Sequence, residues 1–330
     1  MGNRSISIEQ IVSNKNSKKL LFTAGPASLL PENLTGIVPC FGRGDLDYLN
    51  IEDTVMGLLK TMTGKKDIIR MQGSASLALE IMSLSFLFGK VLIISTGFYS
   101  DRLKFLTECA KKNHNQIKNI DCIEWDQINK IQGSYDWVFS CSTETSCGLK
   151  IPIQQLHDLA KKVNGKLMLD ATASIGLESD HYLADVLAFS SCKGLFGLTG
   201  AAFIAFDHKP NYEADSFYLN FSNHFNKMMT GPYHAISSLV DVLPRHEFYR
   251  EAVVINKDKF LKKMDRFLTR HQINQPLLCT QVSTTICTDN KHAVLYYPRG
   301  NDSGSVVCHL GEAHLGANAN ADIINELYTK

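Results

Sequence analysis

Short apolar runs alternate along this chain with longer segments in which apolar residues recur every three or four positions. Short continuous runs are typical of buried strands, and the longer spacing is typical of amphipathic helices. The runs predict strands at residues 67–71, 90–95, 136–140, 166–170, 186–190 and 201–206. The spacing predicts helices at residues 74–88, 99–112 and 153–162, the second with Leu103, Phe105, Leu106 and Ala110 on its apolar side. This alternation predicts an α/β fold with a mainly parallel central sheet flanked by helices.

The pattern also predicts how the chain divides. Residues 1–19 are polar and rich in Asn, Ser and Lys, and we expect an N-terminal arm there. Residues 20–240 carry the alternation and are expected to form one large domain, followed by a smaller C-terminal α+β lobe at 241–330 that ends in a short helix at 321–328. Residues 236–270 are expected to be helical. Their basic residues are expected to form a solvated face: Lys257, Lys259, Lys262, Lys263, Arg266 and Arg270.

Composition narrows the class of protein. The 330 residues include 34 basic and 33 acidic side chains, and a formal net charge of +1 gives no sign of a nucleic-acid or membrane surface. The nine cysteines fit no zinc or disulfide spacing, so we expect no metal site and a reducing, cytoplasmic environment. Residues 1–20 lack the apolar core of a signal peptide, and the apolar segment at 77–88 is too polar to span a membrane.

Residues able to bind a cofactor follow the ends of the predicted strands. Gly73 and Ser74 open a helix, where backbone N–H groups and the helix dipole favour a phosphate, although an ordinary serine N-cap is the alternative. Tyr99 could stack on a planar ring or simply be a core aromatic. Thr145 lies in a polar loop whose hydroxyls could bond a ligand or the loop's own backbone. Because ligands of parallel sheets bind beyond the carboxyl ends of the strands, we expect these residues to meet.

Asp170 and Lys193 carry the strongest chemical signal. Asp170 closes an apolar run, and a buried carboxylate there needs a partner such as a pyridinium nitrogen, an arginine or a helix N-terminus. Lys193 follows another apolar run in a Gly-rich turn, where it is either a candidate amine nucleophile or a lysine that reaches the surface. A pyridoxal phosphate enzyme needs these two groups most, one for a Schiff base and one to keep the pyridine nitrogen protonated. No Gly-x-Gly-x-x-Gly unit or P-loop supports a nucleotide site instead.

Six ordered blocks in residues 20–240 support this interpretation. They are Thr23-Ala24-Gly25-Pro26, Gln72-Gly73-Ser74-Ala75-Ser76, Thr96-Gly97-Phe98-Tyr99, Thr143-Glu144-Thr145-Ser146-Cys147-Gly148, Leu169-Asp170-Ala171-Thr172-Ala173-Ser174 and Ser190-Ser191-Cys192-Lys193. With them the chain resembles the class V, fold-type I pyridoxal phosphate aminotransferases. The resemblance is strongest to the 2-aminoethylphosphonate–pyruvate transaminases, followed by the alanine– and serine–glyoxylate aminotransferases.

The resemblance implies a role for each matching residue in binding pyridoxal 5′-phosphate. The residues implied near the cofactor phosphate are Gly73, Ser74, Ala75, Ser191 and Cys192. Tyr99 would stack on the ring, Thr145 would bond near the ring hydroxyl, Asp170 would pair with the pyridine nitrogen and Lys193 would form the Schiff base. Members of the family are homodimers in which a threonine of the partner subunit reaches the phosphate, and Thr230 matches that position.

One arginine of the phosphonate transaminases is missing from this chain. In those enzymes it grips the substrate carboxylate shortly before a C-terminal Gly-Glu pair, and the comparable stretch here is Ser305-Val306-Val307-Cys308-His309-Leu310-Gly311-Glu312. A bidentate arginine is the usual device for holding a carboxylate or phosphonate. We therefore expect Arg43 or Arg299 to replace it. The chain is also shorter than typical members, with the deficit in the C-terminal lobe.

The sequence thus predicts an aminotransferase with Lys193 and Asp170 as catalytic residues. It would move an amino group from a small, 2-aminoethylphosphonate-like amine or amino acid to a keto acid such as pyruvate or glyoxylate. The alternatives are a glyoxylate-type aminotransferase, or a lyase, decarboxylase or cysteine desulfurase of the same fold, for which Cys279, Cys287 and Cys308 are available. A binding module without catalysis is a further alternative, favoured by the missing arginine and disfavoured by the retained lysine and aspartate.

Overall fold

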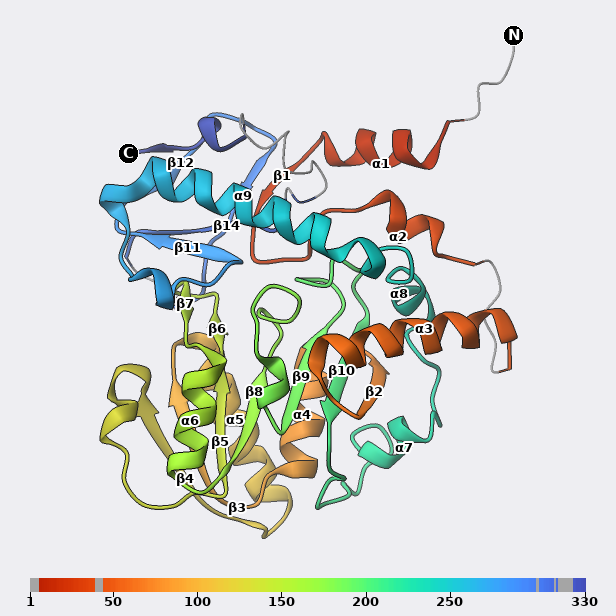
Figure 1. Ribbon diagram of the computed structural model, residues 1–330, viewed down its shortest axis with the longest axis vertical. Coiled ribbons are helices and arrows are strands. Elements are labelled where there is room, and N and C mark those ends of the chain that lie inside the picture. Colours follow the sequence, from red (N-terminus) through yellow and green to blue (C-terminus); the bar gives the residue numbers. More distant parts are fainter. Residues whose placement is uncertain (1–5, 39–43, 301–302, 312, 314–322) are drawn as a thin grey trace.

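A seven-stranded sheet with helices on both faces forms the centre of the molecule (Figure 1). The computed structural model describes residues 6–38, 44–300, 303–311, 313 and 323–330. Neighbouring strands of the sheet are parallel except where β10 pairs with β2 and β9. The order is β2 (Asp67–Gln72), β10 (Ala201–Phe206), β9 (Val186–Ser190), β8 (Lys166–Asp170), β5 (Trp137–Cys141), β3 (Gly89–Ser95) and β4 (Ile117–Glu124). The predicted α/β class with a mainly parallel sheet is confirmed.

Six of these strands agree with the prediction within one residue at each end. Their apolar runs are continuous because helices cover both faces of the sheet, so neither face of a strand carries a polar alternation. β4 was not predicted. It lies at the edge of the sheet, where exposed residues such as Lys118 and Asn119 interrupt any apolar run.

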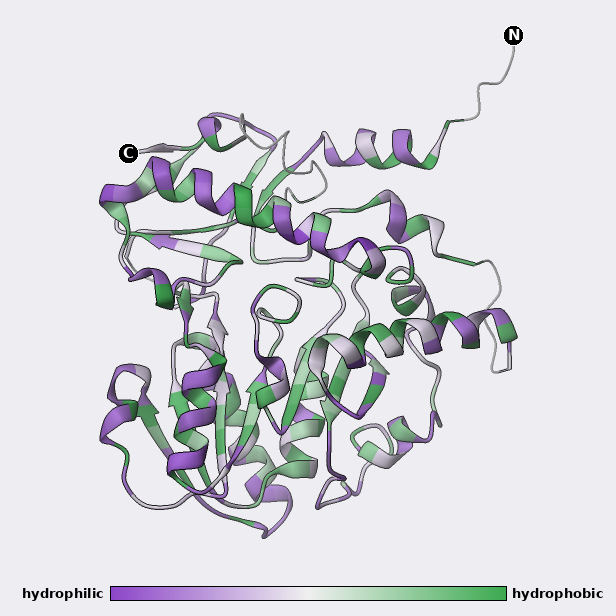
Figure 2. Cartoon of the chain, in the orientation of Figure 1, coloured by the Kyte–Doolittle hydropathy of each residue, from purple (hydrophilic) through white to green (hydrophobic). Residues whose placement is uncertain are grey.

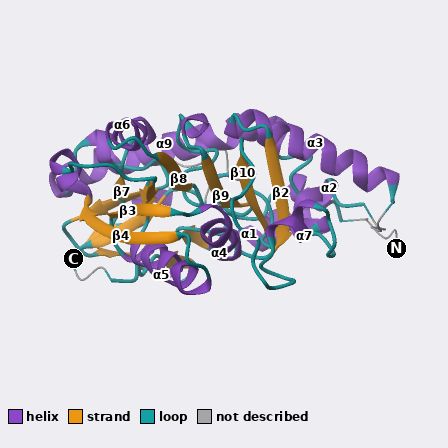
Figure 3. Ribbon diagram, turned by 90° about the horizontal axis from the view of Figure 1, so that it is seen from below, coloured by secondary structure: helices purple, strands orange, loops and turns teal. Residues whose placement is uncertain are grey.

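Helices cover the two faces of the sheet in pairs (Figure 3). α4 (Ala75–Phe86) and α5 (Phe98–Asn113) pack on one face, and α3 (Leu46–Thr63) and α6 (Ile153–Lys162) pack on the other. α4, α5 and α6 agree with the predicted helices within two residues, whereas α3 was not predicted.

The assignment of Phe105 to the apolar side of α5 is wrong. Leu103, Leu106 and Ala110 are buried, but Phe105 is 61% exposed. Two residues turn an α-helix by about 200°, so Phe105 points away from Leu103.

Most of the C-terminal elements, with α1 (Ile8–Asn16), β1 (Leu20–Phe22) and α2 (Pro31–Thr35), lie together at the top in Figure 1. β1 pairs in parallel with β13 (Ala293–Leu295), which joins the N-terminal and C-terminal parts of the chain. β11 (Cys279–Val282) pairs with β14 (Ser305–Cys308) beside α9 (His246–Met264). The other elements are α7 (Phe221–Phe225), α8 (Tyr233–Ser237) and the hairpin of β6 (Thr143–Glu144) and β7 (Leu149–Lys150). Short 3₁₀ helices span Trp125–Lys130, His181–Leu183, Leu243–Arg245, Asp265–Phe267, Gln272–Asn274 and Ile323–Glu326.

The C-terminal helix predicted at residues 321–328 is wrong. Residues 321–322 lie outside the described residues, Ile323–Glu326 form a 3₁₀ turn, and β15 (Tyr328–Thr329) pairs with β12 (Ile286–Cys287). So short a segment has little helical stability of its own, and Tyr and Thr favour strands. The division of the chain at residues 19 and 240 stays a prediction. None of the described helices combines the length and apolar character needed to cross a membrane.

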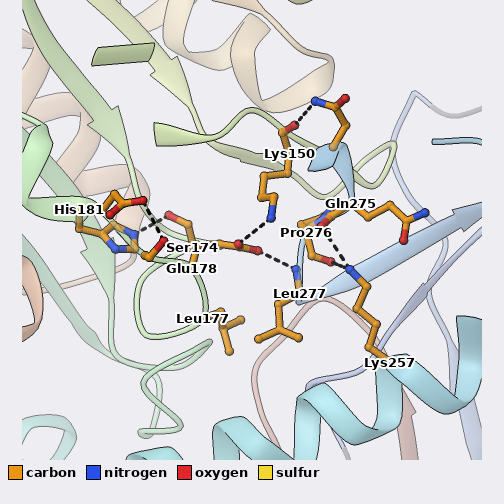
Figure 4. Close-up of polar contacts among 12 residues, drawn as sticks. Lys150, Ser174, Leu177, Glu178, His181, Lys257, Gln275, Pro276 and Leu277 are labelled. Carbon is orange, nitrogen blue, oxygen red and sulfur yellow. Dashed lines mark hydrogen bonds and ion pairs between the residues drawn. The ribbon is translucent and has the colours of Figure 1, made fainter. Parts of the chain in front are cut away.

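Lys257 contradicts the expected solvated basic face. Its side chain is buried, and its ammonium donates hydrogen bonds to the carbonyl oxygens of Gln275 (3.2 Å) and Pro276 (2.8 Å) (Figure 4). Position 257 follows Val253 by four residues and precedes Phe260 by three, so it falls on the buried side of α9. Figure 2 shows hydrophilic and hydrophobic residues alternating along this helix. Burial lowers the pKa of Lys257 to about 8.

Glu178 fastens the C-terminal part of the chain to the central domain at the same junction (Figure 4). One carboxylate oxygen accepts a 2.6 Å hydrogen bond from the backbone N–H of Leu277, and the other pairs with Lys150 at 3.1 Å. Asn274 also donates a side-chain hydrogen bond to the Lys150 carbonyl, at 2.9 Å. These contacts fix the segment that enters β11, and with it the C-terminal elements beyond.

Candidate active site

A cavity of about 770 Å³ opens at the carboxyl ends of the parallel strands. Its walls follow β2, β3, β5, β8 and β9, because parallel strands end at the same edge of a sheet. The predicted site residues that line it are Gly73, Ser74, Ala75, Tyr99, Thr145, Asp170, Cys192, Lys193 and Arg299. The other lining residues are Ser76, Leu79, Arg102, Thr143, Thr172, Ala173, Ser190, Thr199, Gly200, Tyr296 and Tyr297.

Three predicted site residues are not among those that line the cavity. Ser191 is fully buried, and its hydroxyl donates to the carbonyl oxygen of Leu198. Thr230 lies beside Arg70 at a separate small hollow, so its predicted contact across a dimer interface stays a prediction. Arg43 lies outside the described residues.

The start of α4 offers a binding position for an anion. Ser74 has the extended backbone of an N-cap residue, yet its hydroxyl makes no capping hydrogen bond. The N–H of Gly73 donates to the carbonyl of Gly200 at 3.0 Å, which holds the start of the helix against β10. The first N–H groups of a helix have no intrahelical acceptor, and the dipole makes this end positive.

Asp170 ends β8 with its carboxylate almost fully buried, since the residue is only 7% exposed. One carboxylate oxygen accepts a 2.9 Å hydrogen bond from the N–H of Thr172. Among the described residues Asp170 forms no ion pair. Burial therefore raises its pKa, while the Thr172 hydrogen bonds and the charges of Lys193 and Arg102 act in the opposite direction.

Lys193 stands on the turn after β9 and is partly buried. Its ammonium lies 5.8 Å from the centre of the Tyr99 ring. The N-terminal segment packs against this turn, because the N–H of Ala27 donates to the Cys192 carbonyl at 2.9 Å. A Cβ on Gly25, where φ is +129°, would come within 2.9 Å of the Lys193 Cγ, so glycine leaves room for the lysine side chain.

Glu144 links the β6–β7 hairpin to the start of α5. Although fully buried, its carboxylate accepts hydrogen bonds from the backbone N–H groups of Tyr99 (2.9 Å) and Ser100 (3.3 Å). Its other oxygen accepts from the N–H (3.1 Å) and hydroxyl (2.6 Å) of Ser146. A negative charge at a helix N-terminus is favourable, so no basic partner is needed. Through these bonds one carboxylate holds Tyr99 and the neighbouring Thr145 in place.

The hairpin and the C-terminal part supply further hydroxyl groups. The Thr143 hydroxyl is buried and has no hydrogen-bond partner among the described residues. Tyr296, just after β13, lies with its hydroxyl close to Thr145 and Tyr99, and burial raises its pKa. Only the tertiary structure brings this tyrosine to the cavity.

The stretch in which the resemblance leads us to expect an arginine, at residues 305–311, turns inward instead. His309 is 4% exposed, and its ring lies 3.0 Å from the Thr280 hydroxyl. Burial lowers the pKa of His309 to about 3, so the ring is neutral. Arg299 is the predicted replacement that reaches the cavity.

Arg102 is a lining residue that sequence reasoning missed. Its guanidinium donates to the Ser76 hydroxyl at 3.1 Å and lies 5.0 Å from the centre of the Tyr99 ring. The signal was present in the chain, since Arg102 stands four residues after Phe98 and three after Tyr99. Such spacing puts side chains on one face of a helix.

The residues present fit pyridoxal phosphate. A buried carboxylate without a cation (Asp170) suits the pyridine nitrogen, and a buried hydroxyl without a partner (Thr143) suits a polar ring substituent. The uncapped start of α4 suits the phosphate, and Tyr99 offers a ring face next to the Lys193 amine.

Part of the chain is similar in sequence to known aminotransferases. No protein-family model matches the chain. An uncharacterized aminotransferase of Methanocaldococcus jannaschii is 28% identical over 205 residues, which are 58% of this chain and 53% of that protein. A 2-aminoethylphosphonate–pyruvate transaminase of Phocaeicola vulgatus is 27% identical over 202 residues, 56% of this chain and 55% of that protein. The aligned part thus spans about half the length of these curated relatives.

Solved structures agree over nearly the whole chain. The subgroup IV aspartate aminotransferase of Thermus thermophilus has a TM-score of 0.77 at 17% identity and covers 94% of this chain and 100% of its own. The pyridoxamine–pyruvate aminotransferase of Mesorhizobium loti has a TM-score of 0.76 at 17% identity, with 93% and 89% covered. These likenesses confirm the predicted fold, the fold-type I architecture of pyridoxal phosphate aminotransferases.

Proposed function

We propose that this protein is a pyridoxal phosphate-dependent aminotransferase. The observation that carries the proposal is the meeting of Asp170 and Lys193 at one cavity, from the ends of the adjacent strands β8 and β9. Neither an isolated structural aspartate nor a surface lysine accounts for both groups facing the same cavity. The aminotransferase names of the relatives support the same activity.

The predicted site residues would share the binding of the cofactor. Ser74, Ala75 and Cys192 would bind its phosphate together with the start of α4. Tyr99 would stack on the ring, Thr145 would bond near the ring hydroxyl, and the Lys193 amine would bind the aldehyde carbon. Gly73 lets the chain turn closely into α4, and Ser191 supports the phosphate loop from behind.

The reaction needs a proton carrier and a fixed ring charge. Bound pyridoxal phosphate supplies an electron sink for the carbanion left when the donor's Cα–H bond breaks. The Asp170 carboxylate would accept the hydrogen bond of a protonated ring nitrogen and so hold that proton in place. The Lys193 amine would be the proton carrier, accepting the donor's α-proton on Nζ and giving it back.

The donor we propose is a small acidic amine such as 2-aminoethylphosphonate, with pyruvate or glyoxylate as the acceptor. The name of the Phocaeicola relative supports this choice. An alanine– or serine–glyoxylate reaction is the second candidate, because the C-terminal arginine of the phosphonate transaminases is missing from this chain.

A cysteine desulfurase fits the structure less well. Cys279 and Cys308 are buried in β11 and β14, and burial raises the pKa of Cys308, so it is a poor nucleophile. Neither these residues nor Cys287 line the cavity. The position of these cysteines away from the cavity favours a transaminase over a sulfur-releasing enzyme.

The proposal includes a homodimer in which Thr230 of each subunit reaches the other's phosphate site. Phe217, Phe225 and Met228 lie near Thr230 in sequence and are each about half exposed or more, which suits an interface. Sedimentation of the cofactor-loaded protein should give twice the chain mass, and a monomer with full activity would remove this part of the proposal.

The test is the visible absorbance of the purified, cofactor-loaded protein before and after each amino donor. We expect a band that 2-aminoethylphosphonate, or failing that alanine or serine, bleaches. A band that no donor changes would refute aminotransfer, and no band after added pyridoxal phosphate would indicate a binding module. Lys193→Ala should lose the band and at least about a hundredfold in turnover, while the exposed Lys161→Ala should lose neither.

A further inference from the structure

Two arginines line the cavity without an acidic partner. Arg102 comes from α5 and Arg299 from the loop after β13, far apart in the chain. Neither forms an ion pair with a carboxylate in the described part of the molecule. The charged residues that line the cavity are thus three cations, with Lys193, against the single carboxylate of Asp170. This excess of positive charge favours an anionic ligand, beside the cationic group that pairs with Asp170.

Both arginines lie beside the ring of Phe98. The Arg299 guanidinium lies 5.5 Å from the centre of the Phe98 ring, and that of Arg102 lies 6.0 Å from it. Stacking on an aromatic ring orients a guanidinium while leaving its N–H donors free for an oxyanion. Arg102 uses one of these donors on Ser76, and Arg299 is exposed at the cavity mouth.

A ring bound against Tyr99 would compete with Arg102 for that face. Arg102 lies 5.0 Å from the centre of the Tyr99 ring, on which the proposed function places the cofactor. Phe98 is the other ring beside the Arg102 guanidinium, at 6.0 Å, and Arg299 lies beside the same ring.

We propose that Arg102 and Arg299 form a two-arginine clamp for the acidic group of the substrate. The inference rests on the proposed function and deepens it, because it names the substrate class: small amines and amino acids that carry a phosphonate, a phosphate or a distal carboxylate. Two guanidinium groups can each give a phosphonate a pair of charge-assisted hydrogen bonds, which an uncharged donor cannot accept. The clamp supplies what the missing C-terminal arginine does not.

The clamp can be tested without turnover by titrating the cofactor-loaded protein with methylphosphonate in a calorimeter. We expect Arg102→Gln and Arg299→Gln each to weaken binding by about tenfold or more. Arg266→Gln is the matched control, since Arg266 stacks on Phe267 at 4.7 Å but lies away from the cavity, and it should change nothing.

The outcomes separate the clamp from the proposed function. Unchanged methylphosphonate binding in either cavity variant would overturn the clamp. So would an Arg102→Gln variant whose main defect is a weaker affinity for pyridoxal phosphate, because Arg102 would then belong to the cofactor phosphate. A wild-type protein that binds methylphosphonate through both arginines, yet whose absorbance no donor changes, would keep the clamp and refute aminotransfer.

Discussion

Burial shifts two ionisable side chains in opposite directions. Asp170 is a carboxylate whose pKa is raised, and Lys257 is an ammonium whose pKa is lowered to about 8. In each case the low dielectric of the interior disfavours the charged form. Asp170 lines the cavity and has no ion-pair partner among the described residues, whereas the Lys257 ammonium donates to two backbone carbonyls. Asp170 is therefore placed to bind a ligand, and Lys257 is placed to hold neighbouring segments together.

Asp170→Asn should separate stability from function. Without cofactor the free energy of unfolding of the variant should be about 0.5–1 kcal/mol higher than that of the wild type. The substitution removes a buried charge and keeps the Thr172 hydrogen bond. Its affinity for pyridoxal phosphate and its turnover should both fall. Urea unfolding of the cofactor-free proteins and a fluorescence titration with cofactor check the two effects, and a destabilised variant would contradict the first.

Lys257 should make stability depend on pH. Its pKa is depressed in the folded state, so between about pH 8 and its ordinary value the unfolded chain binds the extra proton. The wild type should therefore gain stability relative to Lys257→Met as pH rises from 7 to 10, by roughly 2–3 kcal/mol. Parallel urea titrations measure this difference. The exposed Lys262→Met of the same helix should show no such trend, and equal behaviour of the two variants would disprove the effect.

At the scale of elements, one hairpin and one helix form a unit around the cavity. β6 and β7 are too short to be stable alone, and Glu144 ties them to the N-terminus of α5. The close approach depends on Gly97, where a Cβ would come within 2.9 Å of the Ser146 hydroxyl oxygen. Residues from two different strand ends are thus held by a shared carboxylate.

Replacing Glu144 with Gln should loosen this unit. The glutamine side chain has one accepting oxygen and one NH₂ donor. Its NH₂ group would therefore face either the backbone N–H groups of α5 or the N–H and hydroxyl of Ser146, at a cost of about 1–3 kcal/mol. Urea unfolding should report that loss, and hydrogen exchange should quicken at Tyr99 and Ser100. Asp101→Asn, an exposed residue in the same helical turn, serves as the control. Unchanged exchange at both amides would show that Glu144 does not position α5.

At the scale of the whole molecule, residues of the C-terminal part complete the wall of the cavity, and pairing with the N-terminal part holds them there. β1 pairs with β13, just before Tyr296 and Arg299, and the Glu178 junction holds the segment that leads into β11. The ends of the strands supply the residues proposed to bind the cofactor, and the C-terminal part supplies one of the two proposed substrate contacts, Arg299. Function at this site therefore depends on how firmly the C-terminal part is seated.

Glu178→Ala should weaken that seating. Losing the Leu277 hydrogen bond and the Lys150 ion pair should lower the free energy of unfolding by about 1–3 kcal/mol and raise KM for donors more than it lowers kcat. Glu247→Ala breaks only an exposed pair with Arg250 and should cost less than about 0.5 kcal/mol. Equal changes in the free energy of unfolding and in KM for the two variants would show that Glu178 does not hold the C-terminal part in place.

The sequence by itself determined six of the seven strands of the central sheet and the edge at which the cavity lies. Strands β8, β9 and β10 were predicted to the residue because buried strands are continuous apolar runs, a local property. The same runs placed Asp170 and Lys193 at strand ends, and parallel strands must end at one edge. The fold class followed from this alternation alone.

Only the tertiary structure decided which side chains complete the cavity and which are buried. Tyr296 joins Arg102 and Arg299 at one cavity because α5 and the C-terminal part fold over the same edge, and no local pattern encodes that meeting. Lys257 is buried because α9 packs its 253–260 stripe inward, which the charge pattern could not reveal. Apolar periodicity records burial within one element, whereas contacts between remote elements depend on packing that the chain defines only as a whole.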